Sequence, residues 1–180
     1  MIRPAGSLRR SFESAFAGVM RTVAGQRNMK IHWIAALMVC IVGMALPLDQ
    51  ATRAALIFAV TIVFFAEILN TALEAVVDLF IGDFHRLAMN AKDAAAAGVL
   101  VLATGTVMVF GDLLWHRWQL VEDNLAAVGH SFLFGVPLVA SEALGLFLLR
   151  RSIWAHARLG CSLGLLAPLV ATATDPVFAV

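Results

Sequence analysis

The chain has 180 residues, of which 61% are hydrophobic and 14% are charged, and its formal net charge is +1. Soluble domains are about 45–50% apolar and about 25% charged, so this composition excludes an ordinary soluble globular protein. The near-neutral charge provides no electrostatic footprint for nucleic acid, and two cysteines are too few for a disulfide framework.

The first element that the sequence predicts is an amphipathic helix. Apolar side chains recur at helical spacing from Phe12 to Val23, while Arg10, Glu13 and Arg21 fall on the opposite side. A helix with one apolar and one charged face lies in the membrane interface rather than across the bilayer. We therefore expect an N-terminal surface helix.

Five apolar runs follow this helix along the chain. A bilayer core about 30 Å thick requires roughly 20 apolar residues in a spanning helix. The last run is short and contains Pro168. The runs extend over about Ile31–Leu48, Ala54–Val77, Ala94–Leu114, Leu125–Leu149 and Leu159–Ala173. This pattern predicts an all-α, polytopic membrane protein.

The basic residues predict how these spans are oriented. Of the 13 Lys and Arg residues, only Arg53 and Arg117 lie in the loops that follow the first and third spans. The other 11 (13 minus 2) lie in the N-terminal segment, the 78–93 loop and the 150–158 loop. Because basic loops are retained in the cytoplasm, the N-terminus and the 78–93 loop are predicted to face it.

A polar stripe interrupts the second apolar run. Glu67, Asn70, Glu74 and Asp78 are spaced i, i+3, i+7 and i+11. At about 100° per residue, these side chains fall within an arc of roughly 80° on one helix face. Ionisable groups inside a membrane are costly and by default mark function. A single such group can be a structural contact between helices, but a stripe of four favours a functional site.

The stripe leads into a polar loop with the residues Asp83, His85, Lys92 and Asp93. Carboxylates are ligands for Mg²⁺, lysine suits a polyphosphate, and Glu67 is placed to act as a general base on an alcohol. These groups suit phosphoryl transfer, although the common nucleotide-binding and protein-kinase motifs are absent from the sequence. The residues alone therefore leave two readings open, a membrane phosphotransferase and an ion or proton pathway.

Several segments, in the same order, resemble the prokaryotic diacylglycerol kinase and undecaprenol kinase family over about residues 7–115. They are Ser11–Gly18, Arg27–His32, Glu67–Asp78, and His85 followed by Ala91-Lys92-Asp93. The resemblance implies a lipid kinase domain at 1–118, with a surface helix and three spanning helices. It also implies a homotrimer in the bacterial cytoplasmic (inner) membrane, with its active site facing the cytoplasm. Residues 119–180 lie outside the resemblance and are expected to add about two transmembrane helices of unknown role.

The resemblance also implies roles for individual residues. Glu67 matches the family's catalytic base, Asn70 lines the catalytic site, and Glu74 matches a Mg²⁺-binding glutamate. Gln26 stands where the family often has a second metal-binding glutamate, so Gln26 and Asp78 are weaker candidate ligands. The positions that match the binding site for ATP, the co-substrate, are Asp83, Phe84, His85, Lys92 and Asp93.

The expected identity of the lipid depends on the residues of two segments. Arg27–His32 and Leu69–Ala72 are more similar to the undecaprenol kinase branch than to the diacylglycerol kinase branch. We therefore expect ATP-dependent phosphorylation of a membrane lipid alcohol, with undecaprenol favoured over diacylglycerol. Gln26 and the additional helices leave open a catalytically inactive membrane scaffold or lipid-binding relic of the kinase fold.

Overall fold

The computed structural model describes residues 7–81 and 85–148, and within these ranges its only regular elements are helices. This confirms the predicted all-α class. The short helix α5 was not predicted, because it is too short to give an apolar run. The helices are α1 (Leu8–Gly25), α2 (Arg27–Ala45), α3 (Gln50–Phe80), α4 (Arg86–His116), α5 (Trp118–Asp123) and α6 (Leu125–Leu148).

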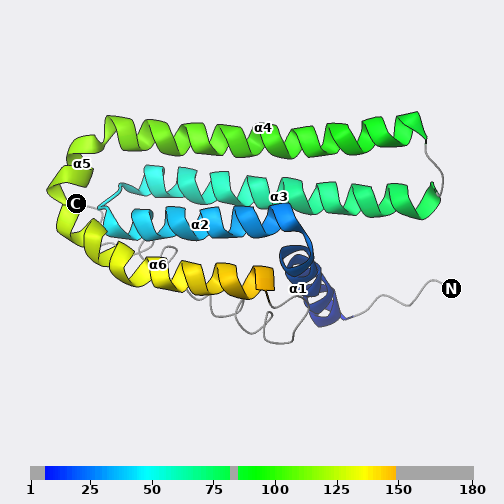
Figure 1. Cartoon of the computed structure of the whole chain (residues 1–180), viewed down its shortest axis with the longest axis horizontal. Helices are drawn as coiled ribbons and strands as arrows, with labels where there is room; N and C mark the ends of the chain where they lie inside the picture. The colour runs from blue at the N-terminus through cyan, green and yellow to red at the C-terminus, as the bar shows by residue number, and fades with distance from the viewer. Residues whose placement is uncertain (1–6, 82–84, 149–180) are drawn as a thin grey trace.

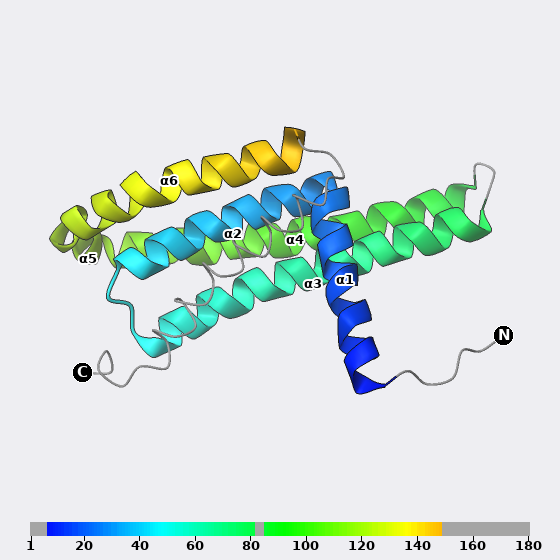
Figure 2. The same ribbon diagram turned by 90° about the horizontal axis from the view of Figure 1, so that it is seen from below.

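Four long helices lie side by side, and α1 crosses them at one side of the bundle (Figures 1 and 2). Helix α3 packs against α4, α6 packs against α2, and α2 also contacts α3. Within the described residues, α2, α3, α4 and α6 are long and apolar enough to cross a membrane. Four of the five predicted spans are therefore confirmed, and the fifth, at 159–173, lies outside the described residues.

Helices α3 and α4 are much longer than α2. Helices α3 and α4 have 31 residues each, whereas α2 has 19. At about 1.5 Å per residue, α3 and α4 are roughly 18 Å longer than α2. The excess lies at the end where α3 leads into α4, beyond the level of α1 (Figures 1 and 2). The predicted spans were shorter because apolar runs stop at polar residues, whereas backbone hydrogen bonding continues through them.

The opposite end of the bundle is fixed by Asp49. Helix α2 ends at Ala45, and Asp49 caps α3 by accepting hydrogen bonds from the backbone N–H (2.8 Å) and hydroxyl (2.9 Å) of Thr52. Arg117 also donates to Asp49 Oδ2 at 2.8 Å, which ties the end of α4 to the start of α3. The Thr52 N–H and hydroxyl, and then Arg117, lower the pKa of the Asp49 carboxyl.

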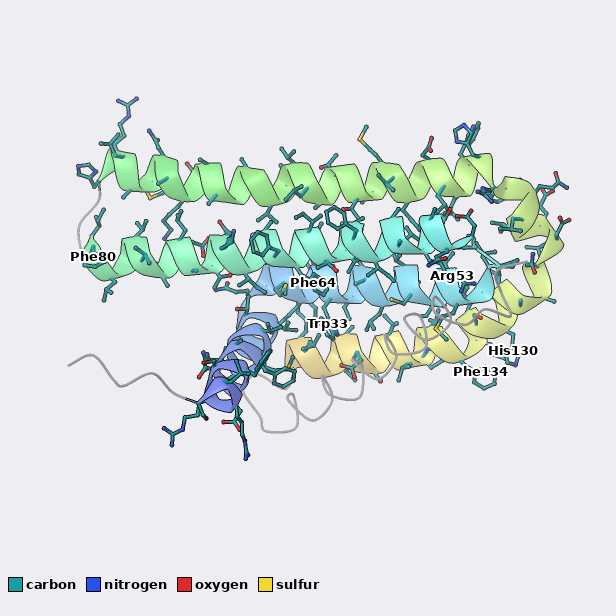
Figure 3. The ribbon with its side chains drawn as sticks, turned by 180° about the vertical axis from the view of Figure 1, so that it is seen from behind. Trp33, Arg53, Phe64, Phe80, His130 and Phe134 are labelled. Atoms are coloured by element: carbon teal, nitrogen blue, oxygen red, sulfur yellow. The ribbon has the colours of Figure 1, made fainter. Side chains whose placement is uncertain are left out.

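Burial is concentrated where α1, α2 and α6 meet. Trp33 of this region stacks on Phe64 of α3, with ring centroids 5.6 Å apart (Figure 3). By contrast, much of the apolar surface of α3 and α4 is exposed, as expected for helices that face lipid or other membrane-embedded protein. The buried cluster consists of Met20, Val23, Met29, Trp33, Leu37, Val139 and Leu146.

Candidate active site

The polar stripe of α3 passes from the buried bundle to the solvent. Glu67 is only 2% exposed and Asn70 is buried, whereas Glu74 is half-buried and the side chain of Asp78 is 66% exposed. About 1.5 Å of rise per residue separates Glu67 from Asp78 by roughly 16 Å along the helix. The deepest carboxyl group is therefore shielded from water, and the outermost one is accessible to a soluble ligand.

Glu67 and Asn70 line a pocket of about 240 Å³ that lies between α2, α3 and α4. Helix α2 contributes Asn28 and His32, which fall on one helix face because they are four residues apart. Helix α4 contributes only apolar side chains, at Ala96, Val99, Leu100 and Ala103. The polar groups of the pocket thus come from α2 and α3, while α4 forms an apolar wall.

Two oxygen atoms in this pocket are buried acceptors that have no hydrogen-bond partner among the described residues, Glu67 Oε2 and Asn70 Oδ1. The amide nitrogen of Asn70 donates to Glu74 Oε1 at 3.0 Å, which joins Glu74 to the same cluster. A buried acceptor without a partner costs about 1–3 kcal/mol, and such groups call for a ligand, an ion or a catalytic role. The geometry suits a ligand that brings a hydroxyl group or a cation.

A second cluster joins the exposed ends of α3 and α4. Lys92 of α4 donates to Asp78 Oδ1 at 2.8 Å, and the Lys92 side chain remains 29% exposed. Asp93 follows Lys92 and is exposed, and His85 is exposed at the N-cap of α4. Asp83 and Phe84 lie outside the described residues. The structure therefore pairs one predicted nucleotide-binding residue, Lys92, with one predicted metal ligand, Asp78.

Gln26 occupies the junction between α1 and α2. Its backbone N–H donates to the carbonyl of Thr22 at 2.9 Å, its own carbonyl accepts from the N–H of Lys30 at 3.2 Å, and its side chain does not cap α2. The backbone of Gln26 thus sets the turn between the helices and leaves its side-chain amide free of a capping role.

The oxygen donors of the site fit Mg²⁺ rather than a metal that requires a complete protein cage. Mg²⁺ is typically held by one or two carboxylates together with waters and substrate phosphates. The Glu74 carboxylate and the unpartnered amide oxygen of Asn70 provide such donors. Across the ranges 7–81 and 85–148, no three His, Cys, Asp or Glu side chains come close enough to enclose a metal.

Sequence analysis assigned no role to Asn28 and His32, although both line the Glu67 pocket. The available signal was the presence of two polar residues, one turn apart, at the start of an otherwise apolar span. That signal identifies a polar face of α2, but the partner of this face depends on how α2 packs against α3. The structure adds both residues to the candidate site.

An apolar groove of about 430 Å³ runs between α2, α3 and α4 and shares Ile31, His32 and Ala103 with the Glu67 pocket. It continues past Val60 to Phe110, along the membrane-spanning length of the helices. The apolar groove therefore adjoins the pocket that contains the buried carboxyl group.

Comparison with known proteins adds independent information on this arrangement. Residues 13–114 match a family model described as prokaryotic diacylglycerol kinase. The chain is 44% identical over 105 residues to a diacylglycerol kinase of Synechocystis sp., 39% over 85 residues to that of Escherichia coli K12, and 38% over 94 residues to an undecaprenol kinase of Bacillus subtilis.

These alignments cover only part of each protein. The Synechocystis alignment includes 58% of this chain and 60% of the relative. The E. coli alignment includes 47% of this chain and 70% of the relative, and the B. subtilis alignment includes 52% and 76%. The chain thus spans about 60% of the length of the Synechocystis relative. The region matched by the family model contains the Glu67 pocket, the groove and Lys92, and it ends before α5 and α6.

Proposed function

The chain belongs to the prokaryotic diacylglycerol kinase family, and we propose that it transfers the γ-phosphate of ATP to the hydroxyl group of a membrane lipid. The observation that carries the proposal is the buried Glu67 carboxyl, whose Oε2 has no partner within the described residues and whose pocket adjoins an apolar groove. Relatives named diacylglycerol kinase and undecaprenol kinase support the same reaction class.

In the proposed reaction, the lipid tail occupies the groove and its hydroxyl group reaches Glu67. The Glu67 carboxylate accepts the hydroxyl proton while the hydroxyl oxygen attacks the γ-phosphorus of ATP. The bond from that phosphorus to the β–γ bridging oxygen breaks, and ADP leaves with the bonding electron pair. Exclusion of water by the apolar wall of α4 favours transfer to the lipid rather than hydrolysis.

ATP would bind at the exposed ends of α3 and α4. Lys92 would exchange its contact with Asp78 for the phosphates, and the neighbouring nucleotide positions would be Asp83, Phe84, His85 and Asp93. Glu74 and Asn70 would hold Mg²⁺, with Gln26 and Asp78 as secondary donors. When bound, Mg²⁺ neutralises phosphate charge.

We assign undecaprenol as the preferred lipid over diacylglycerol. The residues of Arg27–His32 and Leu69–Ala72 support this choice, because they are more similar to the undecaprenol kinase branch. Sequence identity does not add to this choice, because the Synechocystis and E. coli diacylglycerol kinases are 44% and 39% identical and the B. subtilis undecaprenol kinase is 38% identical.

The proposal also includes the location and assembly of the protein. The family and the four apolar helices of the described residues make the chain a multi-pass membrane protein. We place it in the bacterial inner membrane with the Lys92 end in the cytoplasm, in agreement with the distribution of basic residues. Exposed apolar surface on α3 and α4 would allow further copies to pack within the bilayer, consistent with a homotrimer.

The direct test is phosphate transfer from labelled ATP by the purified protein in mixed micelles. Undecaprenol and diacylglycerol are offered separately, each with Mg²⁺ and with a chelator, and Glu67→Gln serves as the inactive control. Mg²⁺-dependent labelling of a lipid by the wild type alone is expected, with undecaprenol the faster substrate. If the folded wild type labels neither lipid, the kinase proposal is wrong and the inactive scaffold is favoured.

A further inference from the structure

Helix α6 packs on the side of α2 that faces away from the candidate site. Lys30, Trp33 and Leu37 of α2 contact or cluster with α6, whereas Asn28 and His32 line the Glu67 pocket. At about 100° per residue, these two sets lie on opposite faces of α2. One wall of the pocket is therefore backed by α6, which lies outside the family match at 13–114.

Lys30 connects the start of α2 to the last turn of α6. The side chain is buried, its Nζ donates to the carbonyl oxygen of Leu146 at 2.7 Å, and it lies 5.5 Å from the ring centroid of Phe147. Carbonyl oxygens in the last turn of a helix carry the negative end of its dipole and attract cations. Because a buried ammonium group is costly without such partners, this contact fixes the two helix ends together.

Gly135 permits the close approach of α6 to α2. A Cβ atom at this position would lie 2.5 Å from Ile41 Cδ1 and 2.8 Å from Ile41 Cγ1, so a larger side chain must separate the helices or displace Ile41. Gly129, one and a half turns earlier on α6, has open space in the corresponding direction. The two glycines therefore provide a matched pair of positions, one in the α2–α6 contact and one outside it.

Trp33 extends this connection to α3. It belongs to the same buried cluster as Val139 and Leu146 of α6, and its ring stacks on Phe64 at a centroid distance of 5.6 Å and an angle of 15° (Figure 3). Phe64 lies one turn before Glu67 on α3. Through Lys30 and Trp33, α6 thus contacts α2, and α2 contacts the turn of α3 that precedes the candidate base.

We propose that α6 is an intramolecular brace that positions the α2 wall of the candidate site, with Lys30 and Gly135 as positioning residues. Its kinetic consequence rests on the proposed lipid kinase function. Displacing α6 should loosen the first turns of α2, which carry Asn28 in the pocket and His32 between the pocket and the lipid groove. The Lys92–Asp78 pair joins α3 to α4 and should be unaffected, so lipid binding should weaken without a change in ATP binding.

The test compares Gly135→Val with Gly129→Val and with the double variant Gly135→Val/Ile41→Ala. The double variant is compensating because it adds three carbon atoms to α6 and removes three from the facing side chain of α2. Backbone hydrogen exchange is measured for residues 27–33 in the full-length protein in detergent micelles. Faster exchange is expected in Gly135→Val alone, with near wild-type exchange in the control and the double variant. Unchanged exchange in Gly135→Val would overturn the brace, whether or not the wild type is a kinase.

Kinetics test whether the brace matters for the site. Gly135→Val and Lys30→Met should raise the KM for the lipid about tenfold at an unchanged KM for ATP, because small misplacements at an active site are costly. Lys30→Arg retains a cationic donor, so its KM for the lipid should stay close to that of the wild type. A loss of kcat with both KM values unchanged would indicate only a smaller folded fraction and would overturn the positioning role. A wild type that phosphorylates no lipid would instead refute the proposed function, and hydrogen exchange would still decide the brace.

Discussion

Replacing Glu67 by glutamine changes one carboxylate oxygen to an amide group and preserves the length and shape of the side chain. In the wild type Glu67 is 2% exposed and lines the pocket, and its Oε2 is buried without a partner among the described residues. Glutamine can donate or accept a hydrogen bond there, but it cannot accept the hydroxyl proton of a lipid. The substitution therefore tests proton transfer separately from binding and folding.

The expected loss follows from burial of the group. General-base catalysis contributes roughly 10²–10⁴-fold, or about 2.7–5.5 kcal/mol at 1.36 kcal/mol per tenfold change in rate. Because Glu67 is shielded from solvent, water cannot readily replace it as the proton acceptor, and we expect kcat to fall by about 10³-fold or more. The substitution leaves Lys92 and Asp78 at the outer end of the candidate site intact, so ATP affinity should change little.

Initial rates at saturating lipid and nucleotide binding by calorimetry measure these two quantities. Glu122→Gln is a matched control, because Glu122 lies on α5 at the other end of the bundle, where it accepts a hydrogen bond from Trp118 at 2.7 Å. It should retain wild-type kinetics. A Glu67→Gln protein that keeps more than about a tenth of the wild-type kcat would refute the assignment of the base.

Three further predictions concern other parts of the molecule. Lys92→Met should raise the KM for ATP about tenfold or more and leave the lipid KM unchanged, and equal effects on both would contradict a phosphate contact. Glu74→Gln should raise the Mg²⁺ concentration needed for half-maximal activity about tenfold, and Gln26→Glu should lower it; opposite shifts in a Mg²⁺ titration would exclude these ligands. Asp49→Ala should lower the free energy of unfolding by about 1 kcal/mol through loss of the α3 cap. The pKa of Asp49 is lower in the folded state than in the unfolded state, where it is near 3.8. The ionised carboxylate should therefore stabilise the fold above the unfolded pKa, and this stabilisation should disappear as the pH falls through the folded pKa. Thermal denaturation of wild type and Asp49→Ala between neutral and acidic pH would detect this, and a constant difference would contradict it.

The sequence was sufficient to predict the helices and the polar stripe because both depend on local patterns. Hydropathy identified the spans that became α2, α3, α4 and α6, and helical spacing predicted α1. The spacing of Glu67 to Asp78 predicted one helix face, and in the structure exposure increases along this face. Helix length could not be obtained in the same way, because hydropathy does not register the polar turns that extend α3 and α4 beyond the interface.

Contacts between distant segments could not be predicted from these local patterns. Lys30 and Leu146 are 116 residues apart in the chain, and the sequence of neither segment indicates its partner. Asn28 and His32 form part of the site only because α2 turns that face toward α3 and α4. The space around Gly135 is likewise defined by Ile41 on another helix. Each of these features depends on tertiary packing, which local propensity does not specify.

We propose that this protein phosphorylates a lipid alcohol at the Glu67 pocket. The most direct test is to incubate the purified wild type and Glu67→Gln with ATP, Mg²⁺ and an equimolar mixture of undecaprenol and diacylglycerol, and to identify the products by mass spectrometry. The wild type is expected to add one phosphoryl group to lipid, mainly to undecaprenol, and Glu67→Gln is expected to add almost none. Equal lipid phosphorylation by both proteins, or none by the folded wild type, would contradict it.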